Sequence, residues 1–262
     1  MYFKRFFTDI KKYSKYLSYA TKASLKTEVS DSYLAWFWWI LEPFCFMLIY
    51  TFIAGVVFKS PIENAPIFVF AGLTIWNFFN KNVIGSVKLL KTNKGIITKI
   101  YLPKYMLYIK LMMVNAFKMA ISFGLCVLLM LFYRVSISAY VLCTIPCLLM
   151  LILVTFGVGC IFMHIGVYVG DLSKMVNIAL RLVFYMSGVF YDVATRVPAP
   201  YGALLLDINP VALAMSGFRN ALLYKAAPDW LMLGIWSVIG LLLSIYGIYL
   251  VYKNENNYGK IL

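Results

Sequence analysis

The sequence has little charge and few of the residue types that build catalytic sites. Only 13% of its 262 residues are charged, against about 25% in soluble domains, and it contains a single histidine. It has no G-x-x-x-x-G-K-[ST] loop, which excludes nucleotide hydrolysis by that mechanism. Candidate acids are single and scattered, as Glu42, Asp171, Asp192 and Asp207 are, so no acid/base set typical of a membrane enzyme is visible.

Cysteine is scarce as well, and its placement excludes two further classes of protein. The five cysteines lie in apolar runs without paired ligand spacing, so we expect neither a disulfide framework nor a metal site. They are interpreted as small buried hydrophobic residues. Residues 1–33 are basic and aromatic and have no apolar signal-peptide core, so we expect the N-terminus to be retained.

Hydrophobic residues are abundant: they make up 63% of the chain, and the mean hydropathy is +0.84. Apolar runs exceed the roughly 18 residues that suggest a spanning helix. We therefore predict an all-α, polytopic membrane protein with a single transmembrane domain over residues 1–262. Six spans are expected, at about 34–58, 66–84, 109–133, 138–167, 175–192 and 230–252.

The basic residues are distributed unevenly between the ends of these spans. Seven lie in 1–33 and seven in 81–110, whereas the opposite side holds only five in total. Positive residues near span ends are retained on the cytoplasmic side. The count therefore predicts that both termini are cytoplasmic and explains the net charge of +14 without a nucleic-acid partner.

Three segments outside the spans have distinct patterns. Residues 2–20 alternate aromatic and basic positions at helical spacing, which predicts an amphipathic helix in the cytoplasmic segment 1–33 that lies on the inner leaflet. It is either a membrane anchor alone or also a docking element. The loop within 85–104 mixes apolar and basic residues around Gly95. It either transmits motion from a soluble partner or merely sets the topology.

The third segment, 193–229, is outside the spans yet largely apolar, and Asn209 and Pro210 interrupt it. Neither apolar piece is long enough to cross a bilayer. The pattern predicts short re-entrant helices that narrow an outward exit. The alternative is a pair of interfacial helices without a gating role.

Two polar residues inside apolar stretches remain open in function. Lys118, in the third predicted span, either extends its amine toward the cytoplasm or serves as a functional charge. His164 is either a proton relay or a packing residue that is hydrogen-bonded to a neighbouring helix.

Residues 32–43 (SYLAWFWWILEP) resemble the first span of the membrane subunits of type-2 ABC exporters that move O-antigen, capsule or teichoic acid. Ser32, Leu34, Trp38 and Pro43 match the family pattern, whereas Ala35 replaces its usual glycine. Upstream, Glu28 stands where a basic residue is common. Further similar stretches lie in the same order at 93–104, 169–192 and 209–223, the last through Asn209, Pro210, Arg219 and Asn220.

The resemblance implies an assembly of two copies of this chain with two copies of a separate ATPase. ATP and Mg²⁺ would be bound by that partner, and this chain would bind no cofactor and be no enzyme. The coupling residues implied are Lys94, Gly95, Ile97, Lys99 and Tyr101. The gate residues implied are Asn209, Pro210 and Arg219.

The first and fifth spans line the path in that family. Aromatic faces suit a sliding polymer, because sugar C–H faces stack on them without a fixed register. The alternative is an aromatic belt at the membrane interface. The candidate path residues are Trp36, Trp38, Trp39, Phe44, Tyr50, Phe184, Tyr185, Phe190 and Tyr191.

The leading hypothesis is the transmembrane subunit of an ATP-driven exporter in the cytoplasmic (inner) membrane. Its substrate would be a polysaccharide linked to undecaprenyl lipid, and its other contacts would be membrane lipids. One rival is an exporter of drugs or small lipids with the same fold. The other is a membrane-embedded enzyme that acts on lipid-linked sugars, which the missing acid/base set disfavours.

Overall fold

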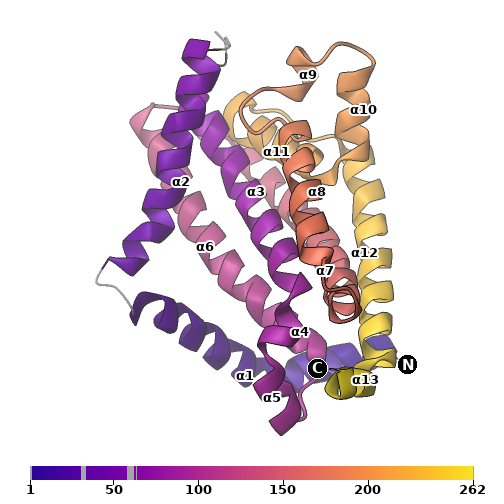
Figure 1. Cartoon of the computed structure of the whole chain (residues 1–262). Helices are drawn as coiled ribbons and strands as arrows, with labels where there is room; N and C mark the ends of the chain where they lie inside the picture. The colour runs from indigo at the N-terminus through magenta and orange to yellow at the C-terminus, as the bar shows by residue number, and fades with distance from the viewer. Residues whose placement is uncertain (1, 31–33, 58–61, 63, 262) are drawn as a thin grey trace.

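A computed structural model describes residues 2–30, 34–57, 62 and 64–261, and every regular element in these ranges is a helix (Figure 1). In chain order the helices are α1 (Tyr2–Ser30), α2 (Ala35–Phe52), η1 (Ile53–Val57), α3 (Ala65–Val87), α4 (Leu89–Thr92), α5 (Lys94–Lys99), α6 (Lys104–Phe132), η2 (Ala139–Cys143), α7 (Thr144–Tyr168), α8 (Leu172–Met186), α9 (Val193–Arg196), α10 (Tyr201–Ile208), α11 (Pro210–Arg219), η3 (Asn220–Tyr224), α12 (Trp230–Lys253) and α13 (Glu255–Ile261). The predicted all-α class is confirmed.

Among the described residues, four helices are long and apolar enough to cross a membrane: α3, α6, α7 together with η2, and α12. They match the predicted second, third, fourth and sixth spans to within a few residues. Helix α3 is the most enclosed, because nearly all its side chains from Ile67 to Phe79 are buried between α2, α6, α7 and α11. The core of the molecule therefore lies around α3.

The predicted first and fifth spans correspond to shorter helices. Helix α2 has 18 residues and continues into the π-helical turn η1. Helix α8 has 15 residues and ends at Met186, fewer than the roughly 20 that a transmembrane helix needs. The expected span at 175–192 is thus only partly helical, because the chain folds back after Met186. Six spans remain a prediction.

The predicted interruption at Asn209 and Pro210 is present as a sharp bend. Helix α10 and the helical run Pro210–Tyr224 meet at 102°. The Asn209 side chain accepts hydrogen bonds from the backbone N–H groups of Val211 (3.0 Å) and Ala212 (3.3 Å), and Pro210 is the first residue of α11. Such a cap and proline start a helix and prevent continuation of the preceding one. The bend fits a re-entrant pair as well as an interfacial one.

Helix α1 is amphipathic as predicted, but its apolar face packs on the bundle. Phe6, Ile10 and Tyr13 contact the hydrophobic core, whereas Lys11 and Lys12 are exposed. Figure 1 shows α1, α4, α5 and α13 at one end of the molecule, and α9 and α10 at the other. Both strongly basic segments of the sequence therefore lie toward the same end.

Candidate functional site

The clearest cross-helix cluster of aromatic side chains joins α2 to the end of α8. The ring of Tyr50 stacks on that of Phe190, with centroids 5.6 Å apart and planes at 12°. Phe184 contacts both rings, at centroid distances of 5.8 Å and 6.4 Å. Tyr185 and Tyr191 each pack edge to face on Phe190, at 6.5 Å and 5.5 Å. We call these five residues the aromatic ladder.

A turn at Gly188 places Phe190 on the ladder. Gly188 has a φ of +66°, which L side chains rarely adopt, and a Cβ there would lie 2.4 Å from Cγ2 of Val193. This turn ends α8 and reverses the chain. The Tyr191 hydroxyl then donates to the backbone carbonyl of Tyr185 (2.6 Å), which holds the returning segment against α8.

The other predicted path residues lie outside this ladder. Trp36 and Trp38 are more than half exposed near the start of α2, and Phe44 is partly buried against the core. Trp39 packs edge to face on Phe117 of α6, with ring centroids 6.1 Å apart. The structure thus brings together the predicted residues from the end of α2 and the region around the end of α8, and separates those from the start of α2.

Two aromatic residues that contact the ladder were not predicted from the sequence. Phe46 stacks on Tyr50 at 6.2 Å, and Trp76 of α3 packs edge to face on Phe184 at 5.1 Å. Phe46 precedes Tyr50 by four residues, so helical spacing could have found it. Trp76 is distant in sequence from both predicted path helices, and nothing in its own segment indicates the contact.

The predicted coupling segment forms two short helices, α4 and α5, followed by an extended stretch. Lys94, Gly95, Lys99 and Tyr101 are exposed, whereas Ile97 is buried. Ile97 is therefore positioned to hold α5 on the bundle. The exposed aliphatic side chains at this surface are instead those of Ile96 (38% exposed) and Ile100 (62% exposed), which the sequence-based list omitted.

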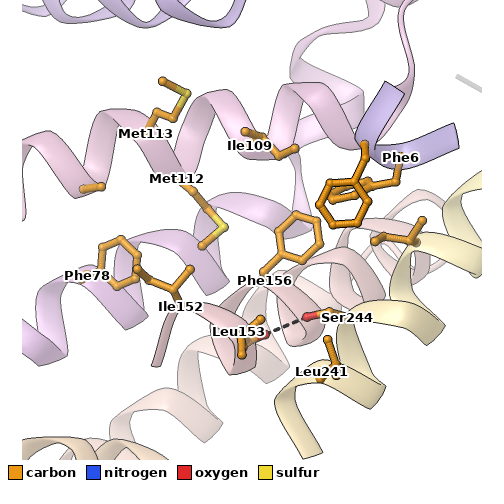
Figure 2. Close-up of a pocket in the computed structure, with 13 residues that line it drawn as sticks. Phe6, Phe78, Ile109, Met112, Met113, Ile152, Leu153, Phe156, Leu241 and Ser244 are labelled. Atoms are coloured by element: carbon orange, nitrogen blue, oxygen red, sulfur yellow. Dashed lines mark hydrogen bonds between the residues drawn. The ribbon is translucent and has the colours of Figure 1, made fainter. Parts of the chain in front are cut away.

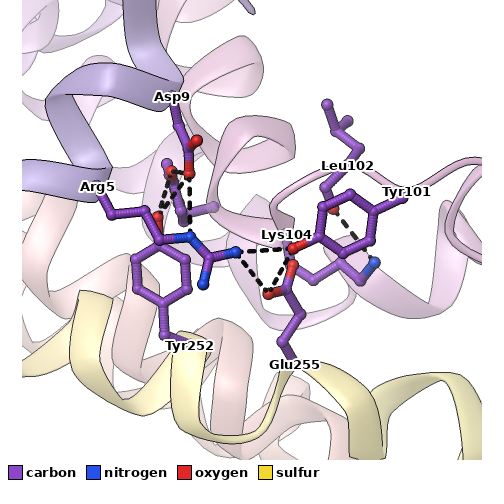
Figure 3. Close-up of polar contacts among 8 residues, drawn as sticks. Arg5, Asp9, Tyr101, Leu102, Lys104, Tyr252 and Glu255 are labelled. Carbon is purple, nitrogen blue, oxygen red and sulfur yellow. Dashed lines mark hydrogen bonds and ion pairs between the residues drawn. The ribbon is translucent and has the colours of Figure 1, made fainter. Parts of the chain in front are cut away.

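A polar network connects this segment to both ends of the chain (Figure 3). The Arg5 guanidinium donates to the Tyr101 hydroxyl at 2.7 Å and lies 3.8 Å from Glu255 of α13. Asp9 accepts hydrogen bonds from the hydroxyls of Tyr105 (2.7 Å) and Tyr252 (2.8 Å). The network joins α1, the α5–α6 connection and the α12–α13 corner through directional contacts.

Glu255 and Tyr258 of α13 are buried and contact the rest of the molecule through polar groups. Burial raises the pKa of Glu255, and the nearby Lys104 and Arg5 cations offset only part of that rise. Tyr258 is fully buried, and its hydroxyl lies 2.7 Å from Nδ1 of His164. This contact agrees with the packing role considered for His164.

Arg219, predicted as a gate residue, is buried and satisfied by backbone carbonyls. It donates to Phe68 O (3.1 Å), Gly188 O (2.9 Å) and Val189 O (2.7 Å), and its guanidinium lies over the Phe68 ring at 3.5 Å. Gly72 leaves room for it, since a Cβ there would lie 2.3 Å from Nη2. Arg219 thus joins the bent segment to α3 and to the Gly188 turn beside the ladder.

An apolar crevice of about 380 Å³ lies elsewhere, between α6, α7 and α12, and Phe6 of α1 closes one end (Figure 2). Its Ser244 hydroxyl donates to the Leu153 carbonyl at 3.0 Å. The crevice shares no residue with the ladder and offers almost no hydrogen-bonding group to the hydroxyls of a sugar.

Within the described ranges, no three His, Cys, Asp or Glu side chains are grouped closely enough to hold a metal ion. The fold and its clusters define a helical membrane protein whose aromatic ladder lies apart from a polar network at its basic end.

Curated proteins with similar sequences were found for this chain. No family model matches the sequence. The O-antigen export system permease protein RfbA of Klebsiella pneumoniae is 24% identical over 243 residues, which are 92% of this chain and 93% of that protein. The permease of the same name from Myxococcus xanthus is 25% identical over 225 residues, 86% of each chain. The expected resemblance to type-2 ABC permeases of polysaccharide export is thereby confirmed.

Proposed function

We propose that this chain is the transmembrane subunit of an ATP-driven exporter that moves a lipid-linked polysaccharide across the cytoplasmic membrane. The observation that carries the proposal is its similarity to O-antigen export permeases over about nine-tenths of its length. The aromatic ladder supports it, because stacked rings guide sugars without a fixed register.

The proposed orientation places α1, α5 and α13 in the cytoplasm. These helices lie at the same end of the molecule (Figure 1), and that end receives the two segments with seven basic residues each. Retention of positive charge on the cytoplasmic side supports this assignment. Both termini would then be cytoplasmic.

The proposed assembly contains two copies of this chain and two copies of a nucleotide-binding ATPase. The ATPase would contact the exposed part of α5 and the following residues, through Ile96, Ile100 and Tyr101. Because Tyr101 bonds to Arg5 and Glu255, a push on α5 would reach α1 and α13 directly. Energy would come from the partner, and this chain would form half of the conduit.

Removing the gene from its native host tests the function. We expect surface polysaccharide to disappear and undecaprenyl-linked polymer to accumulate inside, and the wild-type gene should restore export. Unchanged surface polymer, together with new sensitivity to small hydrophobic drugs, would instead indicate the rival drug or lipid exporter. Chemical modification of a lipid-linked sugar by the purified chain alone would indicate an enzyme.

A further inference from the structure

Two lysines from neighbouring helices line one small polar cavity. Lys81 of α3 and Lys118 of α6 border a cavity of about 40 Å³ whose wall also includes Asn77, Asn115 and Ser122. Lys118 is near the middle of a helix apolar enough to span a membrane. Ionisable groups at such depth are costly and commonly mark binding sites.

Each lysine is paired with a glutamate from a different helix. Nζ of Lys118 lies 2.5 Å from Oε2 of Glu28, near the end of α1, and Nζ of Lys81 lies 3.4 Å from Oε2 of Glu42 on α2. Lys118 is also 5.6 Å from the ring centre of Trp39. Its side chain is 22% exposed, against 42% for Glu28. The carboxylate is therefore the outer partner and the one that is freer to leave.

An apolar groove adjoins this cavity. It has a volume of about 660 Å³, runs between α1 and α6, and shares Trp39 with the polar cavity. Phe117, the neighbour of Lys118 in the chain, lines it. The exposed Lys22 and Lys26 also line it. A hydrocarbon groove that meets two cations fits a molecule with a long apolar chain and an anionic head.

Resting on the proposed function, we propose that Lys81 and Lys118 bind the phosphate of a polyprenyl-phosphate lipid carrier, while the groove takes the adjoining part of its prenyl chain. Ammonium groups hold phosphate through charge-assisted hydrogen bonds. Glu28 and Glu42 occupy the lysines when the carrier is absent. Phosphate binding displaces both carboxylates and frees the end of α1 and the middle of α2.

The polar cavity and the aromatic ladder lie at different positions along α2. Trp39 at the cavity and Tyr50 in the aromatic ladder are separated by about 16 Å at 1.5 Å per residue. The charged head would be held near the start of α2, and the uncharged sugars would meet rings near its end. The apolar crevice of Figure 2 has no charged side chain in its lining, although it shares Phe78 with the polar cavity and Met113 with the groove.

The test measures binding of undecaprenyl phosphate to the full-length chain in neutral-lipid nanodiscs by native mass spectrometry. Lys118→Gln and Lys81→Gln should each weaken binding at least tenfold, and Lys118→Arg should keep it within a few-fold. Glu28→Gln should strengthen binding severalfold, because it removes the competing carboxylate. Lys12→Gln, an exposed site on α1, is the matched control and should leave binding unchanged.

A charge exchange separates binding from a purely structural ion pair. The double variant Glu28→Lys with Lys118→Glu restores attraction between α1 and α6 but moves the cation from α6 to α1. Thermal stability should therefore exceed that of Lys118→Glu alone, while binding of undecaprenyl phosphate stays weak. Full recovery of binding in this variant would overturn the proposal. Equal competition by phosphatidylglycerol, or by inorganic pyrophosphate without a lipid tail, would overturn it too.

The outcomes also distinguish the site from the proposed function. Surface polymer export by the wild-type chain without measurable undecaprenyl-phosphate binding would reject the site and leave the function intact. Lysine-dependent binding in a chain whose deletion leaves surface polymer unchanged would support the site and reject the function.

Discussion

The aromatic ladder and the polar network both join helices through aromatic residues, yet they do so by different physics. In the ladder, Tyr50, Phe184 and Phe190 meet through ring faces and edges, with centroids 5.6–6.4 Å apart. In the network, the hydroxyls of Tyr105 and Tyr252 both donate to the same carboxylate oxygen of Asp9, Oδ2. Ring contacts tolerate sliding, whereas hydrogen bonds weaken steeply with misalignment. The molecule thus has a compliant surface and a directional joint.

Breaking the support of the ladder should have the largest effect. Arg219→Met removes three hydrogen bonds. Phe68 O keeps its helical N–H partner within α3, whereas the Gly188 and Val189 carbonyls lie outside a helix and lose this donor. Each unsatisfied buried group costs about 1–3 kcal/mol, so we expect a loss of at least ~2 kcal/mol in stability, measured as a drop in Tm of the detergent-solubilised protein.

Arg196→Met, at an exposed position on α9, is the control for this change and should leave Tm nearly unchanged. A Tm for Arg219→Met equal to that of the control would show that the buried guanidinium does not support the Gly188 turn.

Breaking the directional joint should have the next largest effect. Asp9→Asn removes the charge that faces Arg5 and weakens two hydrogen bonds from tyrosine hydroxyls, at about 1.5–3 kcal/mol for a charge-assisted interaction. Tm should fall, and ATP-driven export should fall by more than the loss of folded protein explains. Asp171→Asn is the matched control, since its ion pair with Lys174 is highly exposed.

For both variants, polymer export and ATP hydrolysis should be measured in the complex assembled with the ATPase. Asp9→Asn should retain ATP hydrolysis while exporting less polymer per ATP. Equal losses of both activities would contradict a role in transmitting motion.

Changing the ladder itself should reduce export with a smaller effect on folding. Phe190→Ala removes a ring that stacks on Tyr50 and is only partly buried, so we expect polymer export to fall severalfold and Tm to change little. Phe132→Ala, at an 80% exposed position, serves as the control. Normal export by Phe190→Ala would argue against guidance by aromatic faces.

The smallest effect is expected for Trp38→Ala. Trp38 is 56% exposed and lies outside the ladder, near the start of α2. Export measured in the same assay should exceed that of Phe190→Ala. The reverse order would move the sugar path to the start of α2 and away from the ladder.

The sequence predicted best what depends on local patterns. Long apolar runs located α3, α6, α7 and α12, because hydrocarbon thickness fixes the length of a spanning helix. The bend at Asn209 and Pro210 was predictable from capping chemistry. The length of α8 was missed, because the predicted span ran through Ser187 and Gly188, the dipeptide at which the chain folds back.

The site was predictable only in part, since its contacts join distant positions. The aromatic residues near the ends of α2 and α8 were found through family resemblance, but Trp76 was missed. The carbonyl partners of Arg219 include one 151 residues away. The pairing of Glu28 with Lys118 likewise depends on how α1 crosses α6. No periodicity in one segment reports such partners.

Transport by purified components tests the central claim most directly. Liposomes that contain the undecaprenyl-linked polymer should be reconstituted with this chain alone, or with this chain and its ATPase, and transbilayer movement of the polymer measured with and without ATP. The account predicts movement only when both proteins and ATP are present. Equally fast movement with this chain alone would contradict it.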